Sequence, residues 1–413
     1  MKKIGFITAT PPSFNPGMLV CELMAKAFTD TNGLSDHSVF FRLTSMKELL
    51  RYREGADMDE ILKKCDTGIP FNLLNDPQLL HDMIPLYWGD FQHMFIYINV
   101  VSKIAGVDID KAYELLLLSD VAEDLRKRVH TFGSSFLFNS TEELFSEHYG
   151  RRLKNFLKSC SHVQMRDAIS AAIAASCRDS NENCMGVDPA QLLAIPAYEE
   201  KILGPVPVDL RDDPGKSVAL LFFARGDHDD DRLSAFLDSL AHKAYLKTKW
   251  LDWGDRLSFP FLRGAWKGIT PAVPADIMKS DMALMALLKT IRSARCVITD
   301  TYHLCAISWA MGIPAVMIPG DYHPAELIQK KIQQRVRHDK RKILLGQDGL
   351  LDFHIEPRLI DDEAQWDGIT DRLTRDIMNE GLLKEVRNSI AARAGKSAER
   401  LSASLKQSLG IGR

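Results

Sequence analysis

The feature that most constrains the fold of this chain is the segment 295–320, RCVITDTYHLCAISWAMGIPAVMIPG. A short apolar run at 296–299 is followed by a polar turn, a helical apolar segment that ends at Gly312, and a second apolar run from Ala315. Two apolar strands joined by a helix predict a parallel strand–helix–strand unit. Such units occur in sheets that helices cover on both faces, so the segment predicts an α/β protein.

The polar turn of this segment holds the main candidate site residues. In an open parallel sheet, ligands bind in the crevice beyond the carboxyl ends of the strands. The helix start also offers N–H groups and a partial positive charge, which suit phosphate or carboxylate. We predict that His303 and Asp300 are catalytic and that Thr301 and Tyr302 contact an anionic substrate. The alternative is a plain N-cap at 300 or 301, with the histidine packed in the first helical turn.

The remaining sequence predicts two α/β domains. Apolar strand patterns alternate with helical ones in the first half of the chain, and the same alternation restarts with the apolar run 217–225. The stretch between them is rich in Pro, Gly, Asp and Lys, as linkers often are. We expect two Rossmann-like domains facing a cleft, with a helical C-terminal segment. The predicted boundaries are 1–198, a linker at 199–216, 217–362, and C-terminal helices at 363–413.

Charge and cysteine content narrow the class of protein. The chain has 52 Lys and Arg against 55 Asp and Glu, a formal net charge of −3, which argues against a nucleic-acid binder. Its seven cysteines are dispersed without Cys-x-x-Cys spacing, which suits a reducing cytosol and predicts neither a disulfide framework nor a metal site. No apolar run is long enough to span a bilayer, and the N-terminus predicts a first strand rather than a signal peptide. We therefore expect a cytoplasmic protein.

Further candidates follow other predicted strands. Arg225 ends the first strand of the second domain, where its guanidinium would suit an anion; a solvated turn is the alternative. A metal site formed by His228 with the aspartates that follow is a disfavoured alternative, because the spacing matches no known metal scaffold. The absence of a G-x-G-x-x-G fingerprint and of a P-loop disfavours a nucleotide cofactor. We predict that no cofactor is bound.

The first domain offers three weaker candidate groups. Asn15 and Gly17 lie in a turn that would allow close approach of backbone to substrate. Gly133 and Ser134 follow another predicted strand. Asp90 and His93 belong to a segment whose aromatic and polar side chains would suit a sugar acceptor, with an N-cap at Asp90 as the alternative. The residues predicted to bind substrate in this domain are therefore Asn15, Gly17, Asp90, His93, Gly133, Ser134 and, from the segment described below, Arg166.

Two charged segments near the C-terminus have alternative interpretations. The basic run 330–342 would suit an anionic lipid head group or a diphosphate acceptor, but a solvated helix face is favoured. From Leu382 onward, apolar residues at helical spacing predict a helix docked on the protein body, with peripheral membrane contact as the less favoured alternative.

Taken together, these segments resemble the polysaccharide pyruvyl transferase family. That family carries a strand–turn–helix of the form Thr/Ser-Asp-[Arg/Ser]-[Leu/Phe]-His, followed by Gly-x-Pro, which stand here at 299–303 and 312–314. The segment 163–170, VQMRDAIS, resembles the family's strand and Arg-Asp-x-x-Ser helix start, and 187–193, VDPAQLL, resembles its Asp-Pro-x-x-Leu-Leu segment. A looser match is the Asn-Pro-Gly turn at 15–17. The order of these motifs, rather than any one of them, carries the resemblance.

The resemblance implies a GT-B-like fold and an activity. The family transfers a pyruvyl group from phosphoenolpyruvate to two hydroxyls of a sugar, giving a cyclic ketal in a cell-surface polysaccharide such as capsule or exopolysaccharide, or in its precursor. The family histidine carries over to His303, but the family arginine two positions earlier is replaced here by Thr301. Arg166, Arg225 or Arg263 would have to supply the missing charge. The acceptor would be a sugar or a lipid-linked oligosaccharide, handled in the cytoplasm or at the inner face of the membrane.

Two other functions remain open at this point. The turn at 300–306 also resembles the donor-site turn of heptosyltransferase-like enzymes, which would make the protein a GT-B glycosyltransferase that uses a nucleotide sugar. The departure at Thr301 also allows a diverged, non-catalytic member that binds a glycan without transferring a group, since fold does not fix function.

Overall fold

The architecture is taken from a computed structural model of the chain. It describes residues 2–9, 15–42, 71–72, 77–89, 92–105, 107–119, 123–137, 139–178, 183–204, 217–223, 230–253, 283–319 and 340–411.

The first domain is built on a six-stranded sheet in which all paired strands are parallel. The strand order, β3-β2-β1-β4-β5-β6, is that of a doubly wound dinucleotide-binding sheet, whose order reverses between β1 and β4. The connection from β1 to the next helix therefore lies at this switch point. The strands are β1 (Lys3–Thr8), β2 (Ser38–Arg42), β3 (Phe71–Asn72), β4 (Met83–Trp88), β5 (His130–Ser134) and β6 (His162–Met165).

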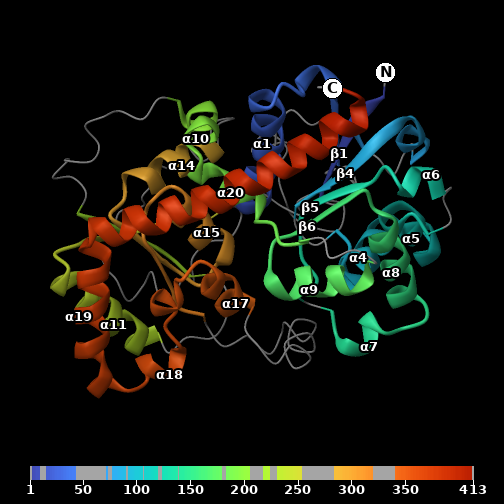
Figure 1. The fold of residues 1–413 in the computed structure, drawn as a ribbon. Coiled ribbons are helices and arrows are strands. Elements are labelled where there is room, and N and C mark those ends of the chain that lie inside the picture. Colours follow the sequence, from blue (N-terminus) through green and yellow to red (C-terminus); the bar gives the residue numbers. More distant parts are fainter. Residues whose placement is uncertain are drawn as a thin grey trace.

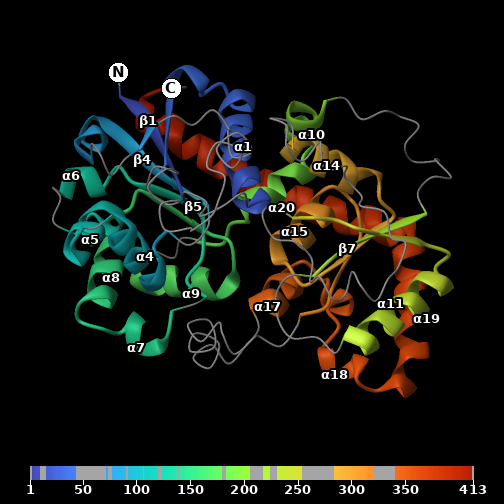
Figure 2. The ribbon, with the colours of Figure 1, turned by 180° about the vertical axis from the view of Figure 1, so that it is seen from behind.

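Helices cover both faces of this sheet (Figures 1 and 2). One face packs against α1, and the other against a second hydrophobic core that includes α4, α5, α8 and α9. The helical elements up to α9 are α1 (Pro16–Thr31), η1 (Ser35–His37), η3 (Pro77–Asp82), α4 (Phe95–Ala105), α5 (Ile109–Leu117), α6 (Glu123–Arg126), α7 (Thr141–Leu144), α8 (Tyr149–Ser159) and α9 (Ala168–Cys177).

The second domain has a smaller sheet of the same kind. Its four strands are parallel in the order β10-β9-β7-β8, and an isolated bridge between Met317 and His354 extends the edge. This order reverses between β7 and β9, so β9 leads directly from the switch point into α15. The elements are β7 (Val218–Phe222), α11 (Asp230–Lys243), β8 (Lys247–Trp250), α14 (Ala283–Ser293), β9 (Cys296–Thr299), α15 (Tyr302–Ala310), β10 (Ala315–Met317), α17 (Lys340–Gln347) and η7 (Leu351–Phe353).

The connection between the domains differs in part from the prediction. After β6 and α9 the chain forms η4 (Pro189–Ala194) and then α10 (Pro196–Leu203). Residues 199–203, predicted to begin an irregular linker, are therefore the second half of a helix that Pro196 starts. Residues 205–216 lie outside the described part of the chain.

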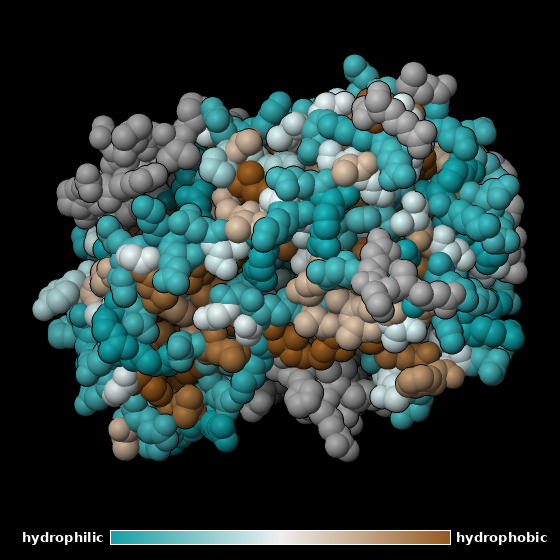
Figure 3. All heavy atoms as spheres, viewed as in Figure 1, coloured by the Kyte–Doolittle hydropathy of each residue, from teal (hydrophilic) through white to brown (hydrophobic). Residues whose placement is uncertain are grey.

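The C-terminal segment is helical, as predicted, and it ties the two domains together. It comprises α18 (Pro357–Ile360), η8 (Glu363–Gln365), α19 (Trp366–Met378) and α20 (Glu380–Leu409). Helix α20 crosses from the second domain to the first, in contact with α19, α15, η4 and β6 (Figures 1 and 2). Its inner face is apolar and buried, from Val386 to Leu405, whereas hydrophilic residues line its outer side (Figure 3). This confirms the predicted docked helix.

In the part of the chain that the structure describes, no helix combines the length and the hydrophobicity needed to cross a bilayer.

Candidate functional site

The turn after β9 is held rigidly at the switch point of the second sheet. The Asp300 N–H donates to the carbonyl of Phe222 at the end of β7, over 3.4 Å. The Thr301 hydroxyl donates to Asp300 Oδ1 over 3.0 Å, and the Thr301 N–H donates to the hydroxyl of Thr299 over 3.0 Å. Asp300 is fully buried. These contacts indicate that Asp300 and Thr301 shape the turn from which α15 begins.

The first turn of α15 meets the first turn of α1. A Cβ added at Gly17 would lie 2.5 Å from His303 Cβ and 2.8 Å from His303 Nδ1, so only glycine fits there. Neither helix is capped by the side chain of its N-cap residue, Asn15 or Thr301, whereas Asp167 and Asp188 do cap α9 and η4. Two helix starts without such caps therefore converge around the imidazole, and their N–H groups and dipoles favour an anion there.

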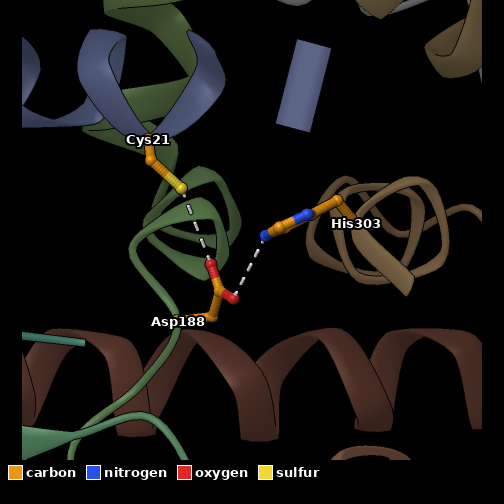
Figure 4. Close-up of side chains that lie close together, drawn as sticks. All are labelled: Cys21, Asp188 and His303. Atoms are coloured by element: carbon orange, nitrogen blue, oxygen red, sulfur yellow. Dashed lines mark hydrogen bonds and ion pairs between the residues drawn. The ribbon is translucent and has the colours of Figure 1, made fainter. Parts of the chain in front are cut away.

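Asp188 lies between Cys21 and His303 at the centre of the candidate site (Figure 4). Its Oδ2 accepts from Arg166 Nη1 over 3.1 Å and lies 3.8 Å from His303 Nε2. Its Oδ1 accepts from the Ala190 N–H over 3.0 Å, as the N-cap of η4, and lies 3.8 Å from Cys21 Sγ. Asp188 thus contacts the side chains of Cys21 in α1 and His303 in α15. It also contacts the Ala190 N–H in η4 and the side chain of Arg166, which follows β6. It can orient His303 and stabilise the charged form of the imidazole.

Arg166 acts within the protein rather than at its surface. It was predicted to contact substrate, but it is 2% exposed and pairs with Asp188. Its guanidinium also lies 5.7 Å from the centre of the Tyr302 ring. Arg166 therefore positions Asp188 and Tyr302 instead of binding substrate directly. Burial, with a smaller contribution from Asp188, holds the pKa of Tyr302 well above its ordinary value, so its hydroxyl stays protonated.

The segment 166–170 also joins the domains. Asp167 caps α9 by accepting from the Ser170 N–H over 2.7 Å, which explains the spacing of the Arg-Asp-x-x-Ser motif. Gln347, at the end of α17 in the second domain, accepts from the Ala168 N–H over 2.6 Å and donates to the Arg166 carbonyl over 3.2 Å. One side chain thus links the second domain to the start of α9.

Gly133 and Ser134 do not reach the site, contrary to prediction. Gly133 has a φ of +75°, and a Cβ there would lie 2.5 Å from Pro189 Cδ. Ser134 is fully buried where β5 pairs with β6. Gly133 instead makes room for Pro189, the residue next to Asp188, so its effect on the site is indirect.

His93 was also wrongly predicted to face a sugar. The side chain is fully buried, and its ring lies 4.7 Å from the rings of both Tyr87 and Phe156. Burial lowers its pKa to about 3, so it is a neutral core residue. Asp90, Arg225, His228 and Arg263, also weighed from the sequence, lie outside the described residues.

The basic run contributes a residue to the site that the sequence did not single out. Arg341, in α17, is 4% exposed and donates to the Asp300 carbonyl over 3.2 Å. The preference for a solvated helix face was therefore wrong at this position, although Lys342 does form an exposed pair with Glu356. Arg341 thus places a buried positive charge at this turn, next to Asp300, the residue that precedes Thr301. Cys21 and Asp188, too, were not predicted as site residues.

Two doubly wound parallel domains, joined by helices and contacting through the helix starts at their switch points, define a GT-B-like α/β protein. MnaA from S. aureus, solved with UDP, is similar over 100% of this chain and 98% of its own, at 13% identity and a TM-score of 0.51. The UDP-GlcNAc 2-epimerase from Neisseria meningitidis, bound to UDP-GlcNAc, matches with 10% identity over 98% of this chain and 100% of its own, at a TM-score of 0.48. The first likeness establishes the fold and no more.

The family model for polysaccharide pyruvyl transferase matches residues 62–322, more than half of the chain. The chain therefore belongs to the polysaccharide pyruvyl transferase family, as its motifs indicated. Among curated proteins, no sequence matches it.

Proposed function

We propose that this protein transfers a pyruvyl group from phosphoenolpyruvate to two hydroxyls of one sugar, forming a cyclic ketal and releasing phosphate. Family membership supports the reaction class. The observation that carries the proposal is the position of His303, which lies at the meeting point of α1 and α15 with its Nε2 3.8 Å from the Asp188 carboxylate. An imidazole next to a carboxylate, at helix starts suited to anions, fits an anionic donor and a proton transfer.

The atoms of this reaction balance without a redox partner or a cofactor. The enol carbon of phosphoenolpyruvate gains a proton and becomes a methyl group, and the neighbouring carbon gains oxocarbenium character. One sugar hydroxyl attacks that carbon, and the second displaces phosphate from it. The two hydroxyl protons are recovered in the methyl group and in the released hydrogen phosphate.

Each site residue has a proposed role in these steps. His303 donates or accepts the transferred proton, and Asp188, held by Arg166, stabilises its charged form. The N–H groups at the starts of α1 and α15 hold the phosphate and carboxylate of the donor. Asp300 keeps the turn in place.

Thr301 stands where many family members carry an arginine, so in this proposal the positive charge for the donor comes from elsewhere. Arg341 would supply it through its electric field rather than by direct contact, because its buried guanidinium bonds the carbonyl of Asp300, the residue before Thr301. Arg225, the sequence-based candidate, stays a prediction. In this proposal the acceptor is a sugar or lipid-linked oligosaccharide of a polysaccharide pathway at the inner face of the membrane, bound on the side of the first domain.

The test is release of phosphate from phosphoenolpyruvate in the presence of a panel of sugar acceptors, with ketal formation followed by NMR. Phosphate release that depends on an acceptor supports the proposal. Thermal-shift measurements with phosphoenolpyruvate and with nucleoside diphosphates separate it from a nucleotide-sugar glycosyltransferase, because only the true donor class should raise the melting temperature. Binding of a glycan with no release of phosphate from phosphoenolpyruvate, whichever acceptor is added, would indicate a non-catalytic member and would overturn the proposal.

A further inference from the structure

The side chains around Asp188 have a second chemical capability besides proton transfer. Cys21 of α1, Asp188 at the start of η4 and His303 of α15 each offer one metal-ligand atom, and these atoms all lie within 4.8 Å of one another (Figure 4). Among the residues that the structure describes, no other group of three such side chains comes this close. Cys21 and Asp188 are buried, and the His303 side chain is 13% exposed, which leaves one edge accessible.

The distances suit a tetrahedral ion. Zinc binds cysteine sulfur at about 2.3 Å, histidine nitrogen at about 2.0–2.1 Å and carboxylate oxygen at about 2.0–2.2 Å, so its ligand atoms are about 3.3–3.7 Å apart. Cys21 Sγ lies 3.8 Å from Asp188 Oδ1, and His303 Nε2 lies 3.8 Å from the other carboxylate oxygen, Oδ2. With one ligand atom taken from each residue, the three atoms lie within 4.8 Å of one another, somewhat wider than in a bound zinc site. Small side-chain rotations would therefore bring the three donors around one ion. A thiolate, an imidazole and a carboxylate together favour Zn²⁺ over Mg²⁺ or Ca²⁺.

The backbone holds these donors in place before any ion arrives. Gly17 and Cys21 are four residues apart on one face of α1, so the close packing of Gly17 on His303 also directs Cys21 towards the imidazole. Asp188 is fixed by the Ala190 N–H and by Pro189, which packs on Gly133. Such preorganisation reduces the entropic cost of binding an ion.

Arg166 and the positive ends of α1 and α15 oppose a cation here. Arg166 Nη1 bonds Asp188 Oδ2, whereas Oδ1 accepts the Ala190 N–H and faces Cys21, so a second lone pair of Oδ1 would bind the metal. The negative charges of the Cys21 thiolate and the Asp188 carboxylate would balance the charge of the ion. Binding replaces the thiol proton of Cys21 by the ion and releases that proton to solvent. The affinity should therefore rise with pH.

We propose that Cys21, Asp188 and His303 form a zinc-binding site that keeps a fourth position open, and that a bound ion inhibits the enzyme by occupying the imidazole of His303. The inhibitory part rests on the proposed function, whereas the binding part does not. Three protein ligands with an open position are typical of sites to which water or a substrate oxygen can add.

The test uses the full chain and Co²⁺ as a spectroscopic substitute for Zn²⁺. Titration should produce a thiolate-to-cobalt charge-transfer band that saturates at one equivalent and is abolished by excess Zn²⁺. Cys21→Ser should lose the band, and His303→Ala and His303→Gln should weaken Co²⁺ binding by more than about tenfold. The matched control is Cys177→Ser, which removes the most exposed of the described cysteines and should keep the wild-type band.

Outcomes for binding and for activity can be separated. The absence of a charge-transfer band, or a band that persists in Cys21→Ser, overturns the metal site whatever the enzyme does. Circular dichroism of each variant identifies loss of fold, and the two His303 variants keep the test decisive if Cys21→Ser does not fold. Where phosphate release is measurable, Zn²⁺ should abolish it and a chelator should restore it. Binding at one equivalent without inhibition would overturn only the inhibitory part.

Discussion

Gly17 of α1 packs directly on the His303 side chain of α15, so closely that a Cβ at position 17 would lie 2.5 Å from His303 Cβ. This contact joins the helix that follows the first strand of one domain to the helix that leaves the switch point of the other. The distance between the two domains at the site is therefore set by the absence of a side chain.

Gly17→Ala should separate the two helices and reduce activity. The added methyl would overlap His303 and displace it from Asp188, and overpacking of this kind costs about 1–3 kcal/mol. Denaturant unfolding and kcat/KM for phosphate release measure the two effects. Gly368→Ala in α19 is the control: nothing lies within 4 Å of its added Cβ, so it should be neutral or slightly stabilising. Equal unfolding free energies and equal kcat/KM values for Gly17→Ala and Gly368→Ala would contradict the close contact between Gly17 and His303.

His303→Ala should lower turnover by about 10²–10⁴-fold if the imidazole transfers the proton. The fold should remain, because Asp188 keeps its partners Arg166 and the Ala190 N–H when the imidazole is removed. Single-turnover and steady-state rates with phosphoenolpyruvate provide the measurement. His37→Ala, at the opposite, amino-terminal end of β2, should keep wild-type rates. Unchanged turnover in His303→Ala would remove this residue from the chemistry.

Asp188→Asn should destabilise the protein as well as slow it. Asparagine can still cap η4, but it removes the carboxylate that pairs with the buried Arg166, and loss of one member of a buried pair costs about 3–5 kcal/mol. Urea unfolding measures the change. The control is Glu114→Gln, which breaks the exposed pair with Lys111 and should cost at most about 1 kcal/mol. If Asp188→Asn and Glu114→Gln lowered the free energy of unfolding by similarly small amounts, the Arg166–Asp188 pair would not contribute to stability as expected.

Gly133→Ala should destabilise the protein more than Gly204→Ala. Both glycines have a φ of +75°, so both variants carry the cost of a positive φ, and Gly204, with a ψ of 176°, lies in a region that essentially only glycine adopts. Only at position 133 does the added Cβ also meet Pro189, at 2.5 Å. A larger loss of unfolding free energy in Gly133→Ala would therefore have to come from this clash. If the two variants were equally stable, Gly133 would be needed for its φ alone.

Acid should weaken the protein through a pair of buried histidines on neighbouring strands. Burial, followed by the nearby His162, lowers the pKa of His130 to about 4. Burial, followed by Arg400 and Arg178, lowers the pKa of His162 to about 4. Both rings are neutral when folded, whereas in the unfolded chain a histidine takes up its proton near pH 6.5. Their contribution is complete above about pH 6.5 and is lost as the pH falls towards 4.

The free energy of unfolding, measured by urea titration at several pH values, should therefore fall between pH 6.5 and 4. His162→Gln should reduce this slope, because it removes one buried histidine, whereas His130 and the buried His93 remain. A flat profile in the wild-type protein would contradict the burial of this pair.

The sequence predicts strands and helices well where the spacing of apolar residues and the turn residues indicate the same boundary. The strand 296–299 is found at the predicted residues, and the predicted helix after it, α15, begins at Tyr302, because the apolar run ends in polar turn residues. Helix α5, by contrast, was not predicted, and the start of the expected linker is α10.

The site itself was only partly accessible from the sequence. His303 and His93 were both singled out because each follows a buried strand, and His93 proves to be a core residue, since strand-end position does not show whether a side chain turns towards solvent or core. The catalytic role of His303 stays a prediction. Asp188 was noted only as part of a motif, because its partners Cys21 and Arg166 become neighbours only when the domains fold and dock.

Helix α20 has a consequence for how the molecule is made. Its residues Ser397 and Ser404 provide hydrogen-bond partners for Gln164 and His130, in strands that a ribosome completes more than two hundred residues earlier. During translation, Gln164 and His130 lack these partners until the Ser397 carbonyl and the Ser404 hydroxyl have been synthesised. The first domain thus reaches its final form only after the second has been synthesised, which ties the maturation of both halves to a single late event.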